Sequence, residues 1–374
     1  MSNGSDAADA TGASSAPVLH DVPSLINFST SVLRTLRLPD GVYCFDRGWA
    51  ELACRGRSLR YTLMVALGFV KAERAGYPTP EPARELVDLV IAEFKDLTIG
   101  DLGLLLWVQS RLGDDRVDAT LRSLNETPNE RLVPLEGMEI AWVVTGLAEA
   151  VSSGAEAEPL LARMLGVLQS RASSKTPLYH HNGHGKGRAL LPNFATEIYS
   201  VLALAEAGRA SNDQHLIARA RRLADHLVEH RGTDGGWPWL FNAETGSVAE
   251  RHQIYSVHQD AMAPMAFFAL AEASGDQRYA LAAVEGLSWC FGNNELGFNF
   301  YDTANRFAHR AIRRKGWADR AELWSNTALS LTPLRKRLVL GSAAINTTCR
   351  PYHLGWILEG WVGREKNIEL VTST

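Results

Sequence analysis

One segment, residues 233–265, gathers more side chains capable of chemistry than any other part of the chain. It contains the runs DGGWPW and YSVHQD, which are separated by a short gap. An imidazole and a carboxylate, here His258 and Asp260, can act as general base and general acid. The aromatic faces of Trp237 and Trp239 suit stacking on a sugar ring or a polyene.

Each of these residues also has a structural role open to it. Trp237 can plug the end of a helical hairpin. Asp260 can cap the helix that it begins, because the N-terminal end of a helix dipole favours an anion. The segment therefore predicts either a reactive site or the closed end of a buried hairpin.

Polar and ionisable side chains recur where other apolar segments begin. A buried charge is costly unless it is paired, so these groups either line a wet cavity or pair with one another, as Arg60 or Arg350 could with Glu139 or Glu197. For the cavity, we predict acid–base roles for Asp260, His258, His353, Glu197 and Glu139. We predict substrate-binding roles for Trp237, Trp239, Tyr255, Gln259, Asn193, Arg350, Tyr352 and Arg60.

No motif in the sequence indicates a metal or a cofactor. The run from His180 to His184 holds three His but lacks the spacing of a zinc site, and the four Cys form no C-x-x-C pair. Gly183 to Gly187 departs from the phosphate-binding P-loop, and no G-x-S-x-G or H-E-x-x-H occurs. We therefore expect no metal ion and no cofactor.

Six stretches rich in Ala, Leu and Gly must position these side chains. A helix that is apolar on every side must be buried on every side. The stretches are 57–75, 98–112, 136–151, 193–208, 256–274 and 349–363. An amphipathic helix precedes each one, at 24–36, 81–95, 114–124, 157–172, 212–230 and 277–291. The alternation predicts an all-α fold, an (α/α)6 toroid in which an inner ring of helices lies within an outer ring.

The connections differ in length at the two ends of this ring. Short links follow the inner helices, and Gly76, Gly113, Gly208 and Gly275 stand where a left-handed cap is needed. Long links at 173–192, 231–255 and 292–348 open onto the other end, where binding and catalysis are expected. Within 292–348 we predict strands at 296–302 and 337–340 and a helix at 318–331. This small β and irregular elaboration would cover part of the cavity mouth.

Bulk composition excludes several classes of function. The chain has 374 residues and a net charge of -4, without a basic stripe, which disfavours nucleic-acid binding. The basic runs 310–315 and 335–337 are typical of solvated surface; the alternative is that they bind an anionic substrate or a partner. No uncharged apolar run is long enough for a membrane span. We expect a cytoplasmic protein with a disordered tail at 1–20, one toroid domain at 21–366 and a flexible C-terminus at 367–374; protein partners are unknown.

Over residues 20–365 the chain resembles the six-hairpin glycosidase-like superfamily of (α/α)6 toroids. The resemblance rests on the six hairpins, on the run at 234–239, and on the openings at 258–260 and 350–353. The chain is also similar to uncharacterised toroid proteins of bacterial polysaccharide gene clusters. The resemblance implies a carbohydrate-active protein that performs hydrolase, lyase or epimerase chemistry on a sugar or oligosaccharide in polysaccharide metabolism or biosynthesis. It implies a His pair, His258 and His353, for epimerases, or carboxylates for hydrolases.

Two other functions stay open. The single run at 234–237 resembles the repeat of squalene cyclases, so a terpenoid cyclase or prenyltransferase toroid is one alternative, although no Asp-x-Asp-Asp motif occurs. That alternative predicts a cavity lined mainly by aromatic residues, with a single acid at its end. The other alternative is a non-catalytic glycan-binding or scaffold toroid, which predicts a closed ring of ion pairs. The lining of the central cavity distinguishes all three.

Overall fold

The structure is a computed structural model, and it describes residues 21–184, 187–315, 321, 325, 326, 328–330 and 341–364. The two predicted tails, the predicted strand at 337–340 and most of the predicted helix at 318–331 lie outside the described residues.

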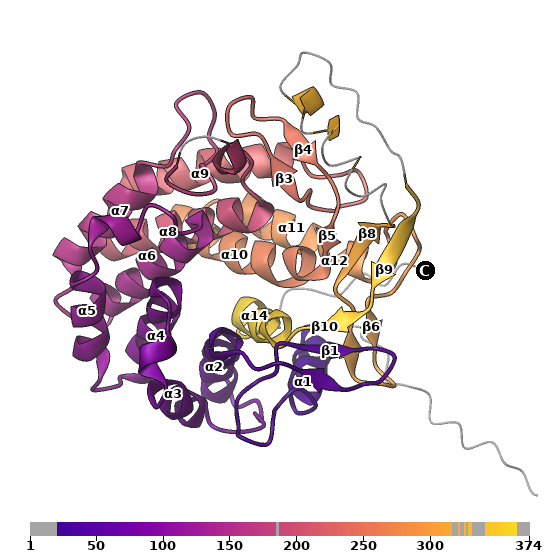
Figure 1. Cartoon of the computed structure of the whole chain (residues 1–374), viewed down its shortest axis with the longest axis horizontal. Helices are drawn as coiled ribbons and strands as arrows, with labels where there is room; N and C mark the ends of the chain where they lie inside the picture. The colour runs from indigo at the N-terminus through magenta and orange to yellow at the C-terminus, as the bar shows by residue number, and fades with distance from the viewer. Residues whose placement is uncertain are drawn as a thin grey trace, which may run out of the picture.

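Inner and outer helices alternate along the described residues, as the sequence predicts. The inner helices are α2 (Leu59–Arg74), α4 (Ile99–Leu112), α6 (Gly137–Ser152), α8 (Phe194–Ser211), α10 (Ala263–Ser274) and α14 (Pro351–Trp361). The outer helices are α1 (Val22–Leu33), α3 (Ala83–Ile91), α5 (Val117–Asn125), α7 (Glu158–Gln169), α9 (Gln214–Glu229), α11 (Arg278–Glu285) and α12 (Leu287–Cys290). Each inner helix contacts the next, and α14 closes the ring against α2 (Figure 1). The all-α toroid is therefore confirmed.

Close approach of the inner helices depends on glycine. A Cβ atom on Gly146 of α6 would stand 2.3 Å from the carbonyl oxygen of Gly103 on α4. A Cβ atom on Gly68 of α2 would stand 2.4 Å from the carbonyl oxygen of Gly355 on α14. Neighbouring inner helices thus pack backbone against backbone, which gives the narrow ring its all-round burial.

The outer helices cover this ring with one apolar face each. In α9 the buried residues are Leu216, Ile217, Ala220, Leu223, Ala224 and Leu227, and this spacing leaves the opposite face to solvent. The sequence placed Gly208 beyond the end of its helix, but α8 continues to Ser211 and ends at Asn212, whose φ is 53°. A Cβ on Gly208 would stand 2.7 Å from Ile217 of α9. The glycine is therefore needed for the close packing of α9 against α8 and does not mark the end of α8.

Short antiparallel strands lie at the end of the ring where the inner helices begin. The strand order β10-β1-β2 joins β10 (Thr348–Cys349), β1 (Asp46–Gly48) and β2 (Cys54–Arg55). Hairpins form between β3 (Leu240–Phe241) and β4 (Val248–Glu250), and between β6 (Tyr301–Asp302) and β7 (Phe307–Ala308). A second three-stranded sheet, with the order β5-β8-β9, joins β5 (Ile254–Tyr255), β8 (Ala311–Arg314) and β9 (Ala343–Asn346). The predicted elaboration at 292–348 thus contains strands. Of the predicted strand 296–302, only the last two residues form a strand, and Asn299 forms an isolated bridge with Phe291.

Side chains satisfy the free N–H groups where most inner helices begin. Ser58 caps α2, Thr98 forms a capping box with Asp101 on α4, and Asn193 caps α8. The fifth inner helix begins differently, with a π-helical turn η4 (His258–Met262) that leads into α10. Because π-turns are typical of functional sites, this turn directs attention to the segment that the sequence singled out.

Candidate active site in the central cavity

A cavity of about 240 Å³ opens where the inner helices begin. Its lining comes from the first turns of α2, α6, α8, η4 and α14, together with the connections that carry Trp239, Tyr255 and Arg310. The lining residues are Arg60, Tyr61, Met64, Met138, Trp142, Asn193, Ala195, Tyr199, Trp239, Tyr255, His258, Met262, Arg310 and Tyr352. The volume falls just below the roughly 300–1,000 Å³ of sites for drug-sized ligands, so it suits a ligand of about one sugar ring.

Two arginines line this cavity in different electrostatic settings. Arg60 donates from Nε to Asp101 at 2.5 Å and from Nη2 to Glu139 at 2.9 Å, and its guanidinium lies 5.1 Å from the ring of Trp142. Arg310 lies 5.2 Å from the ring of Tyr255, but it has no carboxylate partner among the described residues. The Nε of Arg310 is buried without a hydrogen-bond acceptor. Arg310 is therefore the uncompensated cation of the cavity.

His258 faces the same space as a neutral imidazole. Its ring lies 4.8 Å from that of Phe194 and 5.0 Å from that of Tyr255, and it is 5% exposed. Burial, followed by the charges of Arg310 and His353, lowers the pKa of His258 to about 3. Its Nδ1 has no hydrogen-bond partner. Because the ring lines the cavity and is unprotonated, it can accept a proton from a ligand.

Asp260 lies beneath the cavity instead of lining it. Both of its carboxylate oxygens are 2.8 Å from Nε2 of His353, and Oδ2 also accepts from the hydroxyl of Tyr301 at 2.7 Å. The Cys290 thiol donates to Oδ2 at 3.5 Å, and the indole of Trp361 donates to the Asp260 carbonyl at 2.6 Å. Burial and the nearby Asp260 carboxylate raise the pKa of Tyr301 well above its usual value. Asp260 thus anchors the π-turn that presents His258.

The other predicted carboxylates also face away from the cavity. Glu197 is fully buried and accepts from the backbone N of Tyr179 at 3.1 Å, and burial raises its pKa well above the usual range. Glu139 holds Arg60 and accepts from the backbone N of Glu136 at 3.2 Å. In the described part of the chain, no Asp or Glu lines the cavity.

The predicted substrate-binding residues divide into two groups. Asn193, Trp239, Tyr255, Tyr352 and Arg60 line the cavity, whereas Trp237, Gln259 and Arg350 do not. Burial raises the pKa of Tyr352 to about 12, so its hydroxyl stays protonated and can donate a hydrogen bond.

The residues outside the lining have structural contacts. Trp237 is fully buried, with its ring 5.3 Å from Phe194, and its backbone N donates to Oε1 of Gln259 at 3.0 Å. Arg350 donates to the hydroxyl of Tyr61 at 2.7 Å, and its guanidinium lies 3.9 Å from the ring of Phe45. Arg350 therefore positions Tyr61, which does line the cavity.

Four residues of the lining were not among the predicted site residues, namely Arg310, Tyr61, Tyr199 and Trp142. Arg310 was predicted to belong to a solvated basic run, but pairing of Tyr255 with Ala311 brings it over the cavity. Its local sequence carries no signal of this, because the pairing joins segments more than fifty residues apart. Trp142 and Tyr199 face inward from early turns of α6 and α8, as residues of an all-round apolar helix must.

The histidines of the 180–184 run do not converge on one point. His180 lies 3.4 Å from Glu244 through Nε2, whereas His181 lies 3.1 Å from the Thr196 hydroxyl and 3.5 Å from Glu136. Each of these two rings thus has its own partners on a different element.

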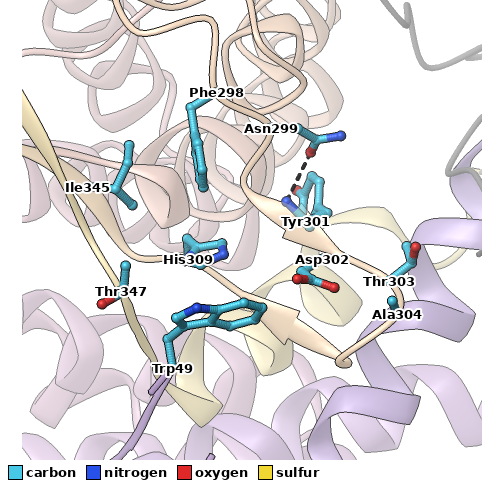
Figure 2. A pocket seen from close by; sticks show the side chains of 10 residues that line it. All are labelled: Trp49, Phe298, Asn299, Tyr301, Asp302, Thr303, Ala304, His309, Ile345 and Thr347. Carbon is cyan, nitrogen blue, oxygen red and sulfur yellow. Dashed lines mark hydrogen bonds between the residues drawn. The ribbon is translucent and has the colours of Figure 1, made fainter.

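A second pocket of about 460 Å³ lies beside the β6–β7 hairpin (Figure 2). Trp49 and His309 lie next to each other in its lining, with ring centres 5.2 Å apart. Burial lowers the pKa of His309 to about 4. His309 and Arg310 are consecutive in extended backbone, so their side chains serve different pockets.

No family model and no curated protein matches the chain. Solved structures match at low sequence identity but over nearly the whole chain. A sugar epimerase from a ruminal bacterium has 11% identity and a TM-score of 0.59, covering 93% of this chain and 100% of its own. An unsaturated glucuronyl hydrolase from Bacillus sp. GL1 has 13% identity and a TM-score of 0.59, covering 93% and 98%. A possible GH105 family member from Salmonella enterica has 12% identity and a TM-score of 0.60, covering 92% and 94%.

These likenesses concern the arrangement of the whole chain rather than individual side chains. No helix in the described ranges has both the length and the apolar character needed to cross a bilayer. The chain therefore has the (α/α)6-toroid fold of the six-hairpin glycosidase-like proteins, as the resemblance in its sequence implied.

Proposed function

We propose that the chain is a carbohydrate-active enzyme that abstracts a proton from a sugar carrying a carboxylate, with epimerase or lyase chemistry. The observation that carries the proposal is the pair of Arg310 and His258, an uncompensated guanidinium and a neutral imidazole in one sugar-sized cavity. A half-buried cation without a partner is costly to hold. An anionic ligand would supply the missing partner, and a uronate combines that anion with a sugar ring.

The chemistry follows from what each group can do. Arg310 binds the substrate carboxylate, while Trp239 and Tyr255 pack against the ring. His258 takes the proton from the carbon next to the carboxylate; the C–H bond breaks, an N–H bond forms, and the electron pair spreads onto the carboxylate beside Arg310. A proton from water on the other face of that carbon gives an epimer. Alternatively, the substituent on the neighbouring carbon departs with its bonding electron pair and takes the proton from His258, which gives an unsaturated sugar. Tyr352, which stays protonated, is placed to donate a hydrogen bond.

Substrate binding also activates the base. The charge of Arg310 is one cause of the low pKa of His258, second to burial. A carboxylate that pairs with Arg310 cancels this charge and raises the pKa of His258 toward the range in which a base is effective. Asp260 and His353 are proposed to act as positioning residues, because their hydrogen bond fixes the π-turn beneath His258.

Two-carboxylate hydrolysis has less support. Hydrolases of that type place an acid and a base, both carboxyl groups, on either side of the scissile bond. Asp101 and Glu139 contact a residue of the cavity lining, but both carboxylates are engaged by that residue, Arg60. The structural neighbours include a sugar epimerase and unsaturated glucuronyl hydrolases, which supports sugars as the substrate class. Polysaccharide metabolism in the bacterial cytoplasm is the setting that we propose from the sequence resemblance.

The aromatic lining is what a terpenoid cyclase would also require. However, cyclase chemistry builds positive charge on the substrate, and the uncompensated guanidinium of Arg310 in the same cavity would raise the energy of a carbocation. The acid nearest the cavity end, Asp260, has its oxygens engaged by His353 and Tyr301. These contacts favour an anionic sugar over a polyene.

Hydrogen–deuterium exchange tests the proposal without knowledge of the product. The chain is incubated in D₂O with glucuronate, galacturonate and uronate-terminated disaccharides, and proton NMR follows the C5–H signal. We expect loss of that signal, or a new vinyl proton, with at least one of them. The reaction should fall by at least ~100-fold in His258→Asn, the order contributed by a general base. His215→Asn, an exposed histidine outside the cavity, is the matched control and should react normally.

The outcomes separate the competing functions. Binding of a uronate that requires Arg310 but gives no exchange and no product would replace the enzyme with a glycan-binding toroid. Release of a sugar without exchange at C5 would indicate hydrolysis. Full exchange in His258→Asn would refute the role assigned to that base.

A further inference from the structure

A cluster of three potential metal ligands lies at the C-terminal end of the outer helix α9. His226, Glu229 and His230 stand at positions i, i+3 and i+4, which places them on one face of the helix. One ligand atom from each side chain lies within 4.8 Å of the others. The two imidazole centres are 4.3 Å apart. None of the three residues lines the central cavity or the pocket of Figure 2.

The hydrogen bonds of the two imidazoles fix which nitrogen is free. Nε2 of His226 lies 2.9 Å from the carbonyl oxygen of Gly246, and Nδ1 of His230 lies 2.9 Å from the carbonyl oxygen of His226. A carbonyl can only accept, so each of these nitrogens carries the proton. The lone pairs therefore remain on Nδ1 of His226 and Nε2 of His230. Histidines that bind metals almost always donate their other N–H to such an acceptor.

The carboxylate of Glu229 is also free to bind a metal ion. Glu229 is exposed and forms no ion pair with the described residues, although α9 has arginines along its length. Two imidazoles and one carboxylate form a donor set that zinc accepts, with water completing the coordination.

We propose that His226, Glu229 and His230 bind one divalent transition-metal ion, with Zn²⁺ as the expected metal. Imidazole ligands favour zinc, copper and nickel over magnesium and calcium. Because His226 also holds the Gly246 carbonyl in the turn between β3 and β4, the metal braces α9 against this hairpin. Trp239 directly precedes β3, so the brace lies one segment away from the central cavity. The role is structural, and it does not rest on the proposed function.

Calorimetric titration tests the site directly. The full chain, without a purification tag and after treatment with a chelator, is titrated with ZnCl₂. We expect one saturable site per chain. His226→Ala and His230→Ala should each weaken Zn²⁺ binding by more than ~100-fold, since loss of a mere outer-shell partner costs about 10–100-fold. His215→Ala, an exposed histidine on the same helix, is the matched control and should bind as the wild type does.

Thermal unfolding supplies a second measurement that does not depend on calorimetry. A metal that binds only the folded chain raises its midpoint of unfolding. Zn²⁺ should raise the midpoint of the wild type and of His215→Ala, but not that of His226→Ala. Circular dichroism of each variant without metal checks that it folds. The proposal is overturned if the wild type shows no saturable Zn²⁺ site, or if His226→Ala and His215→Ala bind Zn²⁺ equally.

Discussion

Arg60 and Arg310 offer an internal comparison that measures what a carboxylate partner contributes in the cavity. Both guanidinium groups lie over an aromatic ring, at 5.1 Å and 5.2 Å, and both line the same space. They differ in that Arg60 has Asp101 and Glu139 as partners, whereas Arg310 has no carboxylate partner among the described residues. Replacing each by glutamine removes the charge while keeping much of the side-chain length.

The expected losses differ because of the groups left behind. The side chains of Arg60, Asp101 and Glu139 are 26%, 8% and 13% exposed, so the ion pairs are intermediate between surface and interior. Exposed pairs contribute about 0–1 kcal/mol, and breaking a fully buried pair costs about 3–5 kcal/mol. We expect Arg60→Gln to lower the free energy of unfolding by about 2–4 kcal/mol, which lies between those limits.

Arg310→Gln should leave the free energy of unfolding almost unchanged. The substitution gives up the cation–π contact with Tyr255, which contributes about 0.5–1 kcal/mol. It also removes the cost of holding an uncompensated charge, which acts in the opposite direction. The difference between the two variants should therefore be about 2–4 kcal/mol, with Arg310→Gln the more stable.

Urea unfolding followed by circular dichroism gives both values on one scale, by linear extrapolation to water. Equal losses in the two variants would refute the reasoning. So would a larger loss in Arg310→Gln, because that result would mean that Arg310 is needed for folding rather than retained for a ligand.

Three further predictions concern the support of the cavity. Asp260→Asn should lower the free energy of unfolding by about 1–3 kcal/mol, because an amide offers one acceptor oxygen and leaves a buried donor unpaired. Gly146→Ala should cost about 1–3 kcal/mol, since its Cβ would stand 2.3 Å from the Gly103 oxygen. Gly166→Ala, where nothing lies within 4 Å, should gain up to about 1 kcal/mol. His258 has a folded-state pKa of about 3 against 6.5 unfolded, so its stabilising contribution is present above pH 6.5 and is lost as the pH falls toward 3. Between pH 7 and pH 4 the wild type should lose about 3 kcal/mol more than His258→Gln.

Each of these predictions has a clear contrary result in the same unfolding assay. An Asp260→Asn variant as stable as the wild type would show that the buried donors find other acceptors. Similar stabilities for the Gly146 and Gly166 variants would mean that the inner helices separate freely. Parallel pH profiles for wild type and His258→Gln would mean that this imidazole is not neutralised by burial.

The helical ring could be predicted from the sequence because its signals are local. The predicted stretch 98–112 differs by one residue from the observed α4 (Ile99–Leu112). All-round apolar composition, a capping Thr98 and the terminal Gly113 act within one helix, and they require no knowledge of the partners. The end of α8 was predicted less well, because Gly208 is required by its contact with the next helix and not by a turn.

Only some of the residues that line the cavity could be predicted from the sequence. The helix starts identified the polar end of the ring, and Asn193, Tyr255, His258 and Tyr352 do line the cavity there. Local sequence does not show which of two nearby aromatic residues faces inward. Trp237 and Trp239 are two residues apart, yet one is packed among buried aromatic rings and the other lines the cavity.

The sequence by itself determined the ring of helices and the end of the ring at which polar groups collect, because helix periodicity and capping are properties of neighbouring residues. Only the tertiary structure decided which of those groups are free to meet a ligand. Arg60 is engaged by carboxylates of two other helices, Asp260 by a histidine of α14, and Arg310 enters the cavity through strand pairing with β5. These contacts join residues far apart in the chain, so burial and pairing follow from the packing and not from the local pattern.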